Sequence, residues 1–319
     1  MVESDDRRMK RSLLVFVVVA AATIVSAQAQ SRAPLQFTYF GAAGWEITDG
    51  KTIVLIDPYL TRAKYAAPND GVSDEDTRPT VTNRSIVESD TATIDAHIKR
   101  ADFVLMTHTH PDHSLDLPYI AKRTGAIVVG TQSTANLVQA FGIPEKQTKV
   151  VSGHEKLTFG DVTVQVIPCI HGIFQAATPG APPPRVPTIP AGLTPPIAYG
   201  QHAEGGTLAY LVGIGGRQIL IFGSMNYIEA ELVGLRPDIA MIGSMPQRRF
   251  IDDYTGRLMR VLGNPPIVIP THWDRWNVPY TFSQQPAIDR VQPFIAEVKA
   301  ASPNTRVIMG THLKPFTID

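Results

Sequence analysis

The heptapeptide Thr-His-Thr-His-Pro-Asp-His occupies residues 107–113, directly after an apolar run that is predicted to be a strand. It places four potential metal ligands within six residues, on a turn that leaves this strand. In such a turn the first two histidines, His108 and His110, can point to one side. Asp112 and His113 can then reach a second point a few ångströms away. Imidazole and carboxylate groups together suit zinc or a related divalent metal, so the heptapeptide predicts a metal centre.

Segments with strand and helix patterns alternate on both sides of the heptapeptide. Short runs rich in β-branched and aromatic residues predict strands at residues 37–40, 45–48, 52–56, 103–106, 126–129, 162–167, 207–212, 218–222, 239–242, 267–269 and 306–309. Helices are expected at residues 94–100, 116–123, 133–141 and 287–301. Strands and helices mixed over the whole length predict an α/β protein, with a single domain at residues 30–319.

The composition excludes several classes of protein. Of 319 residues, 29 are Lys or Arg and 29 are Asp or Glu, so no bulk positive field exists to attract nucleic acid. With 44% hydrophobic and 18% charged residues, the chain is not a disordered tail protein. A single cysteine, Cys169, excludes an internal disulfide framework and a cysteine-rich metal finger. We therefore expect a small-molecule substrate and no nucleic-acid partner.

The first 29 residues read as a secretory signal peptide. Four basic residues between Arg7 and Arg11 precede the uncharged run Leu13–Val25, and Ala27 and Ala29 fit a signal peptidase site. An uncleaved membrane anchor is the alternative, but a bilayer span needs about 20 apolar residues and this run has 13. We therefore expect a periplasmic or secreted protein without a stable membrane anchor after cleavage.

Two long segments carry neither a helix nor a strand pattern. Residues 61–92 are polar and rich in Asp, Asn, Thr and Pro, which is typical of a surface loop or insertion that borders a site. Pro179–Pro196 holds eight prolines in eighteen residues, which excludes a helix or a central strand. We retain two interpretations of this second segment: it is a surface linker, or it forms a lid or wall of the substrate site.

The heptapeptide resembles the His-x-His-x-Asp-His signature of the metallo-β-lactamase superfamily, and the likeness extends over nearly all of residues 30–319. Residues 55–58, Leu-Ile-Asp-Pro, look like the early aspartate motif of that family. His171 follows a predicted strand as the third family histidine does, and His272 falls where the last ligand is expected. The order of motifs is most similar to the branch that contains the ascorbate-6-phosphate lactonase-like hydrolases.

The resemblance implies an αββα sandwich with zinc at one edge of its two sheets. One metal would be held by His108, His110 and His171. A second would be held by Asp112, His113 and His272. Asp112 would also orient the nucleophilic hydroxide. Asp57 would hydrogen-bond near the metal loop and orient ligands, with a simple turn-forming aspartate as the alternative.

Ser224 departs from the family pattern. Most family hydrolases have Gly-Asp after the strand at residues 218–222, and that aspartate bridges both metals, whereas this chain has Gly-Ser. The centre therefore holds either two zinc ions without a bridging carboxylate or one ion. Ser224 itself either hydrogen-bonds the nucleophilic water or serves a tight turn. His202, after the proline-rich segment, either faces the substrate or packs within the fold.

The resemblance implies an exported, zinc-dependent hydrolase that uses a metal-bound hydroxide to open a small cyclic ester or amide. Among such substrates, a lactone is favoured over a β-lactam. A phosphodiesterase is the alternative within enzymes, and it needs cations near the metals. The candidates for them are Arg248, Arg249 and Arg275. A metal-holding binding protein without turnover is the alternative outside enzymes. The sequence points to no general acid and to no oligomeric state.

Overall fold

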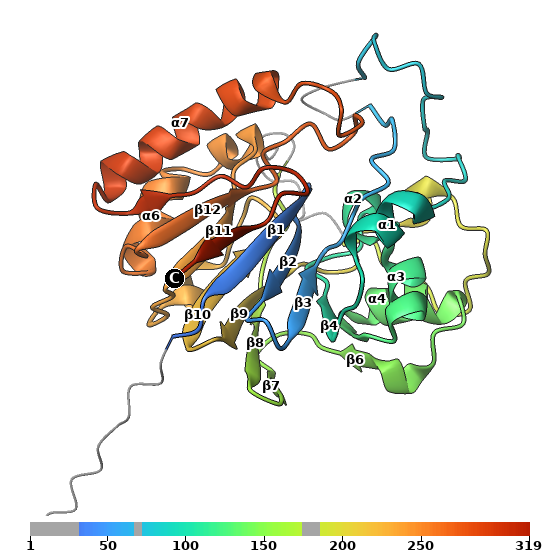
Figure 1. The fold of residues 1–319 in the computed structure, drawn as a ribbon, viewed down its shortest axis with the longest axis horizontal. Coiled ribbons are helices and arrows are strands. Elements are labelled where there is room, and N and C mark those ends of the chain that lie inside the picture. Colours follow the sequence, from blue (N-terminus) through green and yellow to red (C-terminus); the bar gives the residue numbers. More distant parts are fainter. Residues whose placement is uncertain (1–31, 67–71, 174–185) are drawn as a thin grey trace, which may run out of the picture. The chain divides into compact units, whose positions relative to one another are not determined.

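Two seven-stranded sheets pack against each other at the centre of the fold (Figure 1). The computed structural model describes residues 32–66, 72–173 and 186–319, so the predicted signal peptide lies outside the described residues. The buried side chains between the sheets come from both of them, as with Phe37 and Trp45 on one side and Val164 and Ile219 on the other.

The first sheet combines an antiparallel half with a parallel half. Its order is β14 (Phe316–Ile318), β1 (Leu35–Gly41), β2 (Gly44–Thr48), β3 (Ile53–Ile56), β4 (Phe103–Leu105), β5 (Ile127–Gly130) and β6 (Thr148–Val150). Pairing is antiparallel from β14 to β3 and parallel from β3 to β6. The five strands expected between residues 37 and 129 are confirmed to within a few residues.

The second sheet has the same mixed character. Its order is β13 (Arg306–Val307), β12 (Ile267–Thr271), β11 (Ile239–Gly243), β10 (Arg217–Phe222), β9 (Leu208–Ile214), β8 (Val162–Pro168) and β7 (Lys156–Phe159). Pairing is antiparallel from β7 to β10 and parallel from β10 to β13. Because β8 and β10 both run antiparallel to β9, the strands β8, β10, β11 and β12 end at the same edge.

Helices cover the outer face of each sheet. The first sheet carries α1 (Thr91–His97), α2 (Pro111–Ser114), α3 (Leu117–Thr124) and α4 (Gln132–Ala140), and the second carries α5 (Glu229–Leu232), α6 (Tyr254–Val261) and α7 (Gln285–Ala301). Short 3-10 helices occupy Glu145–Gln147, Tyr199–Gln201 and Pro246–Phe250. This arrangement confirms the α/β class and the αββα order of layers.

The helix α1 begins three residues before the predicted start. Asp90 accepts a hydrogen bond from the backbone N–H of Thr93 at 3.0 Å, which caps the helix at that point. In the part of the chain that the structure describes, no helix has the length and apolar character needed to cross a bilayer.

The segment before α1 folds back over the carboxyl ends of the strands. It contains no helix in its described residues, but isolated bridges join Tyr65 to Val81 and Ile86 to Ala198. Arg62 and Asp76 are buried within it. The predicted irregular loop is therefore tied to the rest of the fold and can form part of a site.

Candidate metal centre

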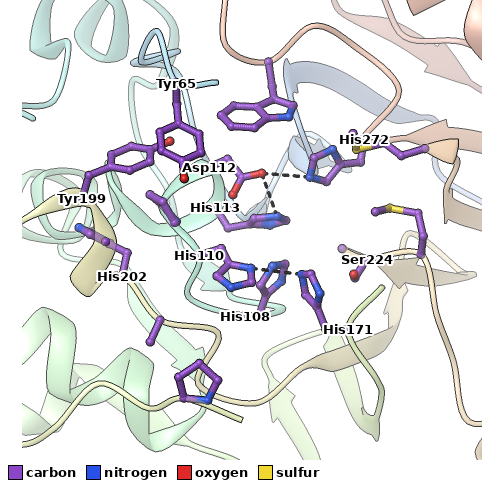
Figure 2. Close-up of a pocket in the computed structure, with 18 of the residues that line it drawn as sticks. Tyr65, His108, His110, Asp112, His113, His171, Tyr199, His202, Ser224 and His272 are labelled. Carbon is purple, nitrogen blue, oxygen red and sulfur yellow. Dashed lines mark hydrogen bonds and ion pairs between the residues drawn. The ribbon is translucent and has the colours of Figure 1, made fainter. Parts of the chain in front are cut away.

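The six predicted ligands converge on one cavity of about 420 Å³, at the carboxyl ends of the strands (Figure 2). They are His108, His110, Asp112, His113, His171 and His272. The heptapeptide follows β4, His171 lies beyond β8, and His272 follows β12 directly. Since these strands end at the same edge of their sheets, residues more than 150 positions apart meet there.

Three histidines form the first cluster. They are His108, His110 and His171, and their candidate ligand atoms lie within 4.8 Å of one another. Nδ1 of His110 lies 3.2 Å from Nε2 of His171. Nε2 of His108 is buried and has no hydrogen-bond partner. A buried ring nitrogen without a partner is unusual, and a metal ion would satisfy it.

An aspartate and two histidines form the second cluster. They are Asp112, His113 and His272, and their ligand atoms also lie within 4.8 Å of one another. Oδ2 of Asp112 lies 3.1 Å from Nε2 of His272 and 3.6 Å from Nε2 of His113. This cluster carries a negative charge, which the first cluster lacks.

The spacing within both clusters fits a small divalent metal ion. Ligands that lie about 2.0–2.1 Å from a tetrahedral zinc ion are about 3.3 Å from each other. The closest pairs, His110 with His171 and Asp112 with His272, are 3.2 Å and 3.1 Å apart. The residues present therefore fit two zinc sites side by side.

Hydrogen bonds from behind the clusters fix the orientation of three imidazole rings. Nδ1 of His108 lies 3.1 Å from Oγ1 of Thr107. Nδ1 of His113 lies 2.9 Å from Oδ2 of Asp57, and Nδ1 of His171 lies 2.8 Å from the backbone oxygen of Gly172. In each ring Nε2 is left to face the cluster, as is typical of metal-ligating histidines.

Asp57 connects β3 to the heptapeptide. It is fully buried, and its Oδ1 accepts a hydrogen bond from the backbone N–H of Thr107 at 2.7 Å. Its Oδ2 accepts from the Thr107 hydroxyl and contacts His113. Gly223 lies so close that a β-carbon there would collide with Thr107 Oγ1. Asp57 thus holds the heptapeptide in place through its contacts with Thr107 and His113.

The electrostatic environments of the two clusters differ. Burial lowers the pKa of His108 and His171, and burial together with His171 lowers the pKa of His110 to about 3. Burial alone would raise the pKa of Asp112, but His113 and His272 hold it well below its usual range. The histidines of the first cluster are therefore neutral at physiological pH, as metal ligands must be.

A buried ion pair supports His272. This residue adopts a φ of 52°, and its backbone N–H donates to the carbonyl oxygen of Ala42 at 2.7 Å. Asp274 accepts from the backbone N–H of Ala42 at 2.9 Å and pairs with Arg62 at 2.9 Å. The sequence did not single out Asp274 or Arg62, although an aspartate two residues after a predicted ligand was a possible signal.

Two neighbouring side chains complete the support. Tyr39 donates its hydroxyl proton to Asp274 at 2.9 Å, and His312 Nε2 lies 2.9 Å from the same carboxylate. Burial would raise the pKa of Asp274, but Arg62 and His312 hold it far below its usual range. The group stays ionised and fixes the turn that carries His272.

Ser224 and His202 both line the cavity. The hydroxyl oxygen of Ser224 accepts a hydrogen bond from the backbone N–H of Gly172 at 2.8 Å, so Ser224 positions the segment that carries His171. Nδ1 of His202 lies 2.8 Å from the hydroxyl oxygen of Ser114, and burial lowers its pKa to about 4. Among the described residues, the carboxylates found in candidate metal groups are Asp57 and Asp112.

The remaining cavity wall is mainly aromatic and apolar. The rings of Tyr65 and Tyr199 are tilted against each other with centroids 4.9 Å apart, and Trp276 stacks on Tyr65 at 6.4 Å. Met225 and Met245 contribute thioethers. The described lining includes no lysine or arginine. Of the proline-rich segment, Pro187 lines this cavity, whereas residues 179–185 lie outside the described residues.

The arginines expected near the metals of a phosphodiesterase lie elsewhere. Arg248 is buried and pairs with Glu297 at 2.6 Å, and with Arg249 it lines a different cavity of about 480 Å³. The backbone N–H of Arg275 donates to Gln284, and its guanidinium donates to the carbonyl of Ser283.

Comparison with known proteins identifies the family. Residues 36–272 match the model described as the beta-lactamase superfamily domain, and the chain belongs to this family. A UPF0173 metal-dependent hydrolase of Symbiobacterium thermophilum is 27% identical over 255 residues, which are 76% of this chain and 86% of that protein. One of Thermodesulfovibrio yellowstonii is 25% identical over 279 residues, 83% and 89% of the two chains. One of Oenococcus oeni matches over about half its own length, with 29% identity over 143 residues.

Solved structures share the fold at low sequence identity. Igni18, a metallo hydrolase from Ignicoccus hospitalis, is 16% identical with a TM-score of 0.56, and the match covers 90% of this chain and 99% of that one. A possible metal-dependent hydrolase from Veillonella parvula gives 15% identity and the same TM-score, covering 90% and 100%. The fold is therefore the metallo-β-lactamase fold, and the chain is a metal-dependent hydrolase of that superfamily.

Proposed function

We propose that this chain is an exported, zinc-dependent hydrolase that opens a small, neutral cyclic ester or amide, with lactones preferred over β-lactams. The proposal is carried by one observation. Six candidate metal ligands in two clusters form the base of a cavity whose other described walls are mainly aromatic or apolar and include no lysine or arginine. The motif order shared with the lactonase-like branch supports the choice of lactones.

The two clusters would hold two zinc ions, one on the three histidines and one on Asp112, His113 and His272. When bound, zinc lowers the pKa of a coordinated water molecule to about 7 and polarises the carbonyl oxygen of the substrate. Of the ligands that the protein supplies, the histidines of the first cluster are already neutral and Asp112 is already anionic. Burial would lower the pKa of His113, but Asp112 and Asp57 raise it, so zinc binding would displace a proton from this ring. Hydrogen bonds such as that between His113 and Asp57 already orient the rings. Such preorganisation lowers the cost of reaching the transition state.

Asp112 has a further part in this reaction. It stays ionised, and its Oδ2 already faces His113 and His272. The carboxylate accepts a hydrogen bond from the attacking water and so directs a lone pair of that water at the ring carbonyl. Tyr65 and Trp276 close one side of the cavity, which keeps further water away from the reacting group.

A phosphodiesterase is less well supported, because a phosphodiester carries a negative charge that the described cavity walls do not meet. Arg249, which is exposed, and Arg275, which is half-buried, provide the test. We expect Arg249→Glu and Arg275→Glu to leave lactone turnover within about twofold, since neither side chain lines the cavity. Loss of turnover in either variant would favour a charged substrate.

The proposed function is tested on purified, zinc-loaded protein with a panel of lactones, β-lactams, thioesters and phosphodiesters. We expect hydrolysis of lactones above all others, and none by His110→Ala. Turnover confined to phosphodiesters, or none on the whole panel, would contradict the proposal. Export is tested separately by N-terminal sequencing of the protein recovered from a bacterial periplasm, with Gln30 expected as the first residue.

A further inference from the structure

Four aromatic side chains form a continuous row beside the metal cavity. In order along the row they are Tyr199, Tyr65, Trp276 and Tyr59. The centroids of neighbouring rings lie 4.9, 6.4 and 6.3 Å apart, a range in which aromatic rings attract one another. The rings come from three separate parts of the chain, which are the segment before α1, the 3-10 helix Tyr199–Gln201 and the segment after β12. The first three rings of the row line the cavity.

Tyr65 is the half-buried member of this row. The other three rings are at most 5% exposed. Trp276 and Tyr59 belong to a small buried cluster, and Tyr65 packs against that cluster from outside. Figure 2 shows the ring of Tyr65 directed into the cavity, on the same side as Tyr199. The surface of the Tyr65 ring is therefore open to a ligand in the cavity, whereas the other rings mainly support it.

Hydrogen bonds hold Tyr65 at both ends. Its backbone oxygen accepts a hydrogen bond from Nδ2 of Asn277 at 2.7 Å. Its hydroxyl donates to Oδ1 of Asn83 at 3.1 Å. Asn83 is fixed in turn, because its backbone oxygen accepts from the N–H of Gly200 at 2.9 Å. The orientation of the Tyr65 ring is therefore set before any ligand binds, which reduces the entropy cost of binding.

The chemistry of these walls favours an aromatic group on the ligand. An aromatic ring that meets a tyrosine ring, offset-stacked or edge to face, gains more free energy than the buried area alone provides. Met225 and Met245 also line the cavity, and thioethers make favourable contacts with aromatic rings. The described lining includes no lysine or arginine, so these walls offer no counter-charge to an anionic substituent.

We propose that Tyr65 forms a subsite for an aryl substituent, and that preferred substrates are neutral lactones or cyclic amides with an aromatic ring attached beside the reacting carbonyl. Tyr65 and both ligand clusters line the same cavity. A substituent next to the carbonyl can thus contact Tyr65 while the carbonyl faces the clusters. This inference rests on the proposed function for its reaction, though not for its binding step. It makes Tyr65 a residue that determines specificity.

The turnover test compares α-benzyl-γ-butyrolactone with α-cyclohexylmethyl-γ-butyrolactone, which share the reacting ring and the leaving group. The ratio of their kcat/KM values is measured on the zinc-loaded full chain. We expect this benzyl-to-cyclohexylmethyl ratio to be at least about threefold higher in the wild type than in Tyr65→Leu. Comparing the two proteins cancels the different hydrophobicity of the two substituents. In Phe141→Leu, which changes a partly exposed ring outside the cavity lining, the ratio keeps its wild-type value.

Two further variants of Tyr65 separate its ring from its hydroxyl and from its role in the fold. Tyr65→Phe keeps the ring, so the ratio stays within about twofold of the wild type. If the ratio in Tyr65→Phe falls to that of Tyr65→Leu, the hydroxyl recognises the substrate and the proposal is wrong. Tyr65 lies in an isolated β-bridge with Val81, a backbone that suits β-branched residues. Tyr65→Ile therefore takes the place of Tyr65→Leu if the leucine variant does not fold.

Binding is measured independently of turnover. Calorimetric titration of zinc-loaded protein compares α-benzyl-δ-valerolactam with α-cyclohexylmethyl-δ-valerolactam. We expect the ratio of their association constants to be at least about threefold higher in the wild type than in Tyr65→Leu. If no lactone is hydrolysed but this difference is seen, the proposed function fails and the aryl subsite stands. Equal ratios in wild type and Tyr65→Leu, in turnover and in binding, overturn the inference and leave the proposed function untouched.

Discussion

The two ligand clusters of the cavity are built in different ways. The first consists of three neutral imidazoles, whereas the second includes the ionised carboxylate of Asp112. The first is backed by a hydroxyl and a backbone carbonyl, through Thr107 and Gly172. The second is backed by the buried carboxylate of Asp57, which pairs with His113.

In the proposed two-zinc centre, this difference predicts how each cluster responds to serine at residue 224, where the family resemblance implies a bridging aspartate. A bridging carboxylate would give both ions an anionic ligand, and Ser224 supplies none. The second cluster retains Asp112, so its attraction for a cation does not depend on residue 224. The first cluster has no carboxylate in its candidate group, so without a bridging aspartate it has no anionic ligand at all. We therefore infer that the first cluster binds its ion more weakly.

Removing a ligand from the first cluster has the largest expected effect. His110→Ala takes away a ring nitrogen that lies 3.2 Å from His171, and we expect turnover to fall to the uncatalysed background. The metal content should drop from two ions to one, with the remaining ion on the second cluster. Activity assays and elemental analysis measure this, with the exposed His97→Ala as the matched control. An active His110→Ala protein would show that the first cluster is dispensable.

Breaking the buried ion pair between Arg62 and Asp274, next to the turn that carries His272, has the next largest expected effect. Asp274→Asn leaves the guanidinium of Arg62 buried without its counter-charge, which costs about 3–5 kcal/mol of unfolding free energy. Urea unfolding of the metal-free protein measures this loss. Asp253→Asn removes one half of an exposed pair with Arg260 and should cost at most about 1 kcal/mol. Similar losses in both variants would mean that the buried pair does not hold the His272 turn.

A variant of Asp57 tests whether its contact with His113 strengthens zinc binding at the second cluster more than at the first. Asp57→Asn removes the carboxylate that contacts His113, so we expect the affinity of the second cluster for zinc to fall about 10–100-fold. Competition with a chelator measures both affinities. Asp116→Asn is the control, because Asp116 is equally buried but its hydrogen bonds go to Leu60 and Thr61. A loss confined to the first cluster would reverse the comparison.

The smallest expected effect is the contribution of His202 to the pH dependence of the free energy of unfolding. Its pKa in the folded protein is about 4, whereas an unfolded chain takes up this proton near pH 6.5. The free energy of unfolding of the wild type therefore decreases as the pH drops from about 6.5 towards 4, because the unfolded state binds more protons than the folded state. Relative to wild type, metal-free His202→Asn should gain about 1.4 kcal/mol between pH 7.5 and 5.5. Unfolding curves at the two pH values measure it, and parallel curves would place His202 in a more solvated environment than the structure shows.

Much of the fold, and the clustering of the candidate ligands, could be predicted from the sequence. Short apolar runs predict strands because each is buried on one or both faces, and the strand near residues 162–167 alternates as its burial does. The heptapeptide is recognisable because its ligands are adjacent in sequence. His171 and His272 required the family resemblance, since their proximity arises only when β8 and β12 join one sheet.

The support around the ligands could not be predicted, because it is formed by long-range contacts. Arg62 and Asp274 are 212 residues apart, and each alone reads as an ordinary surface charge. Tyr65 reaches the cavity because the irregular segment before α1 folds back over the strands.

In the proposed mechanism, both clusters hold a metal ion in the active protein. Elemental analysis of fully active, zinc-loaded protein, combined with stepwise removal by a chelator, tests it most directly. We predict two zinc ions per chain, with the first ion to leave coming from the three-histidine cluster and turnover lost with it. A ratio near one zinc per chain in fully active protein would show that one of the two clusters is not needed for turnover.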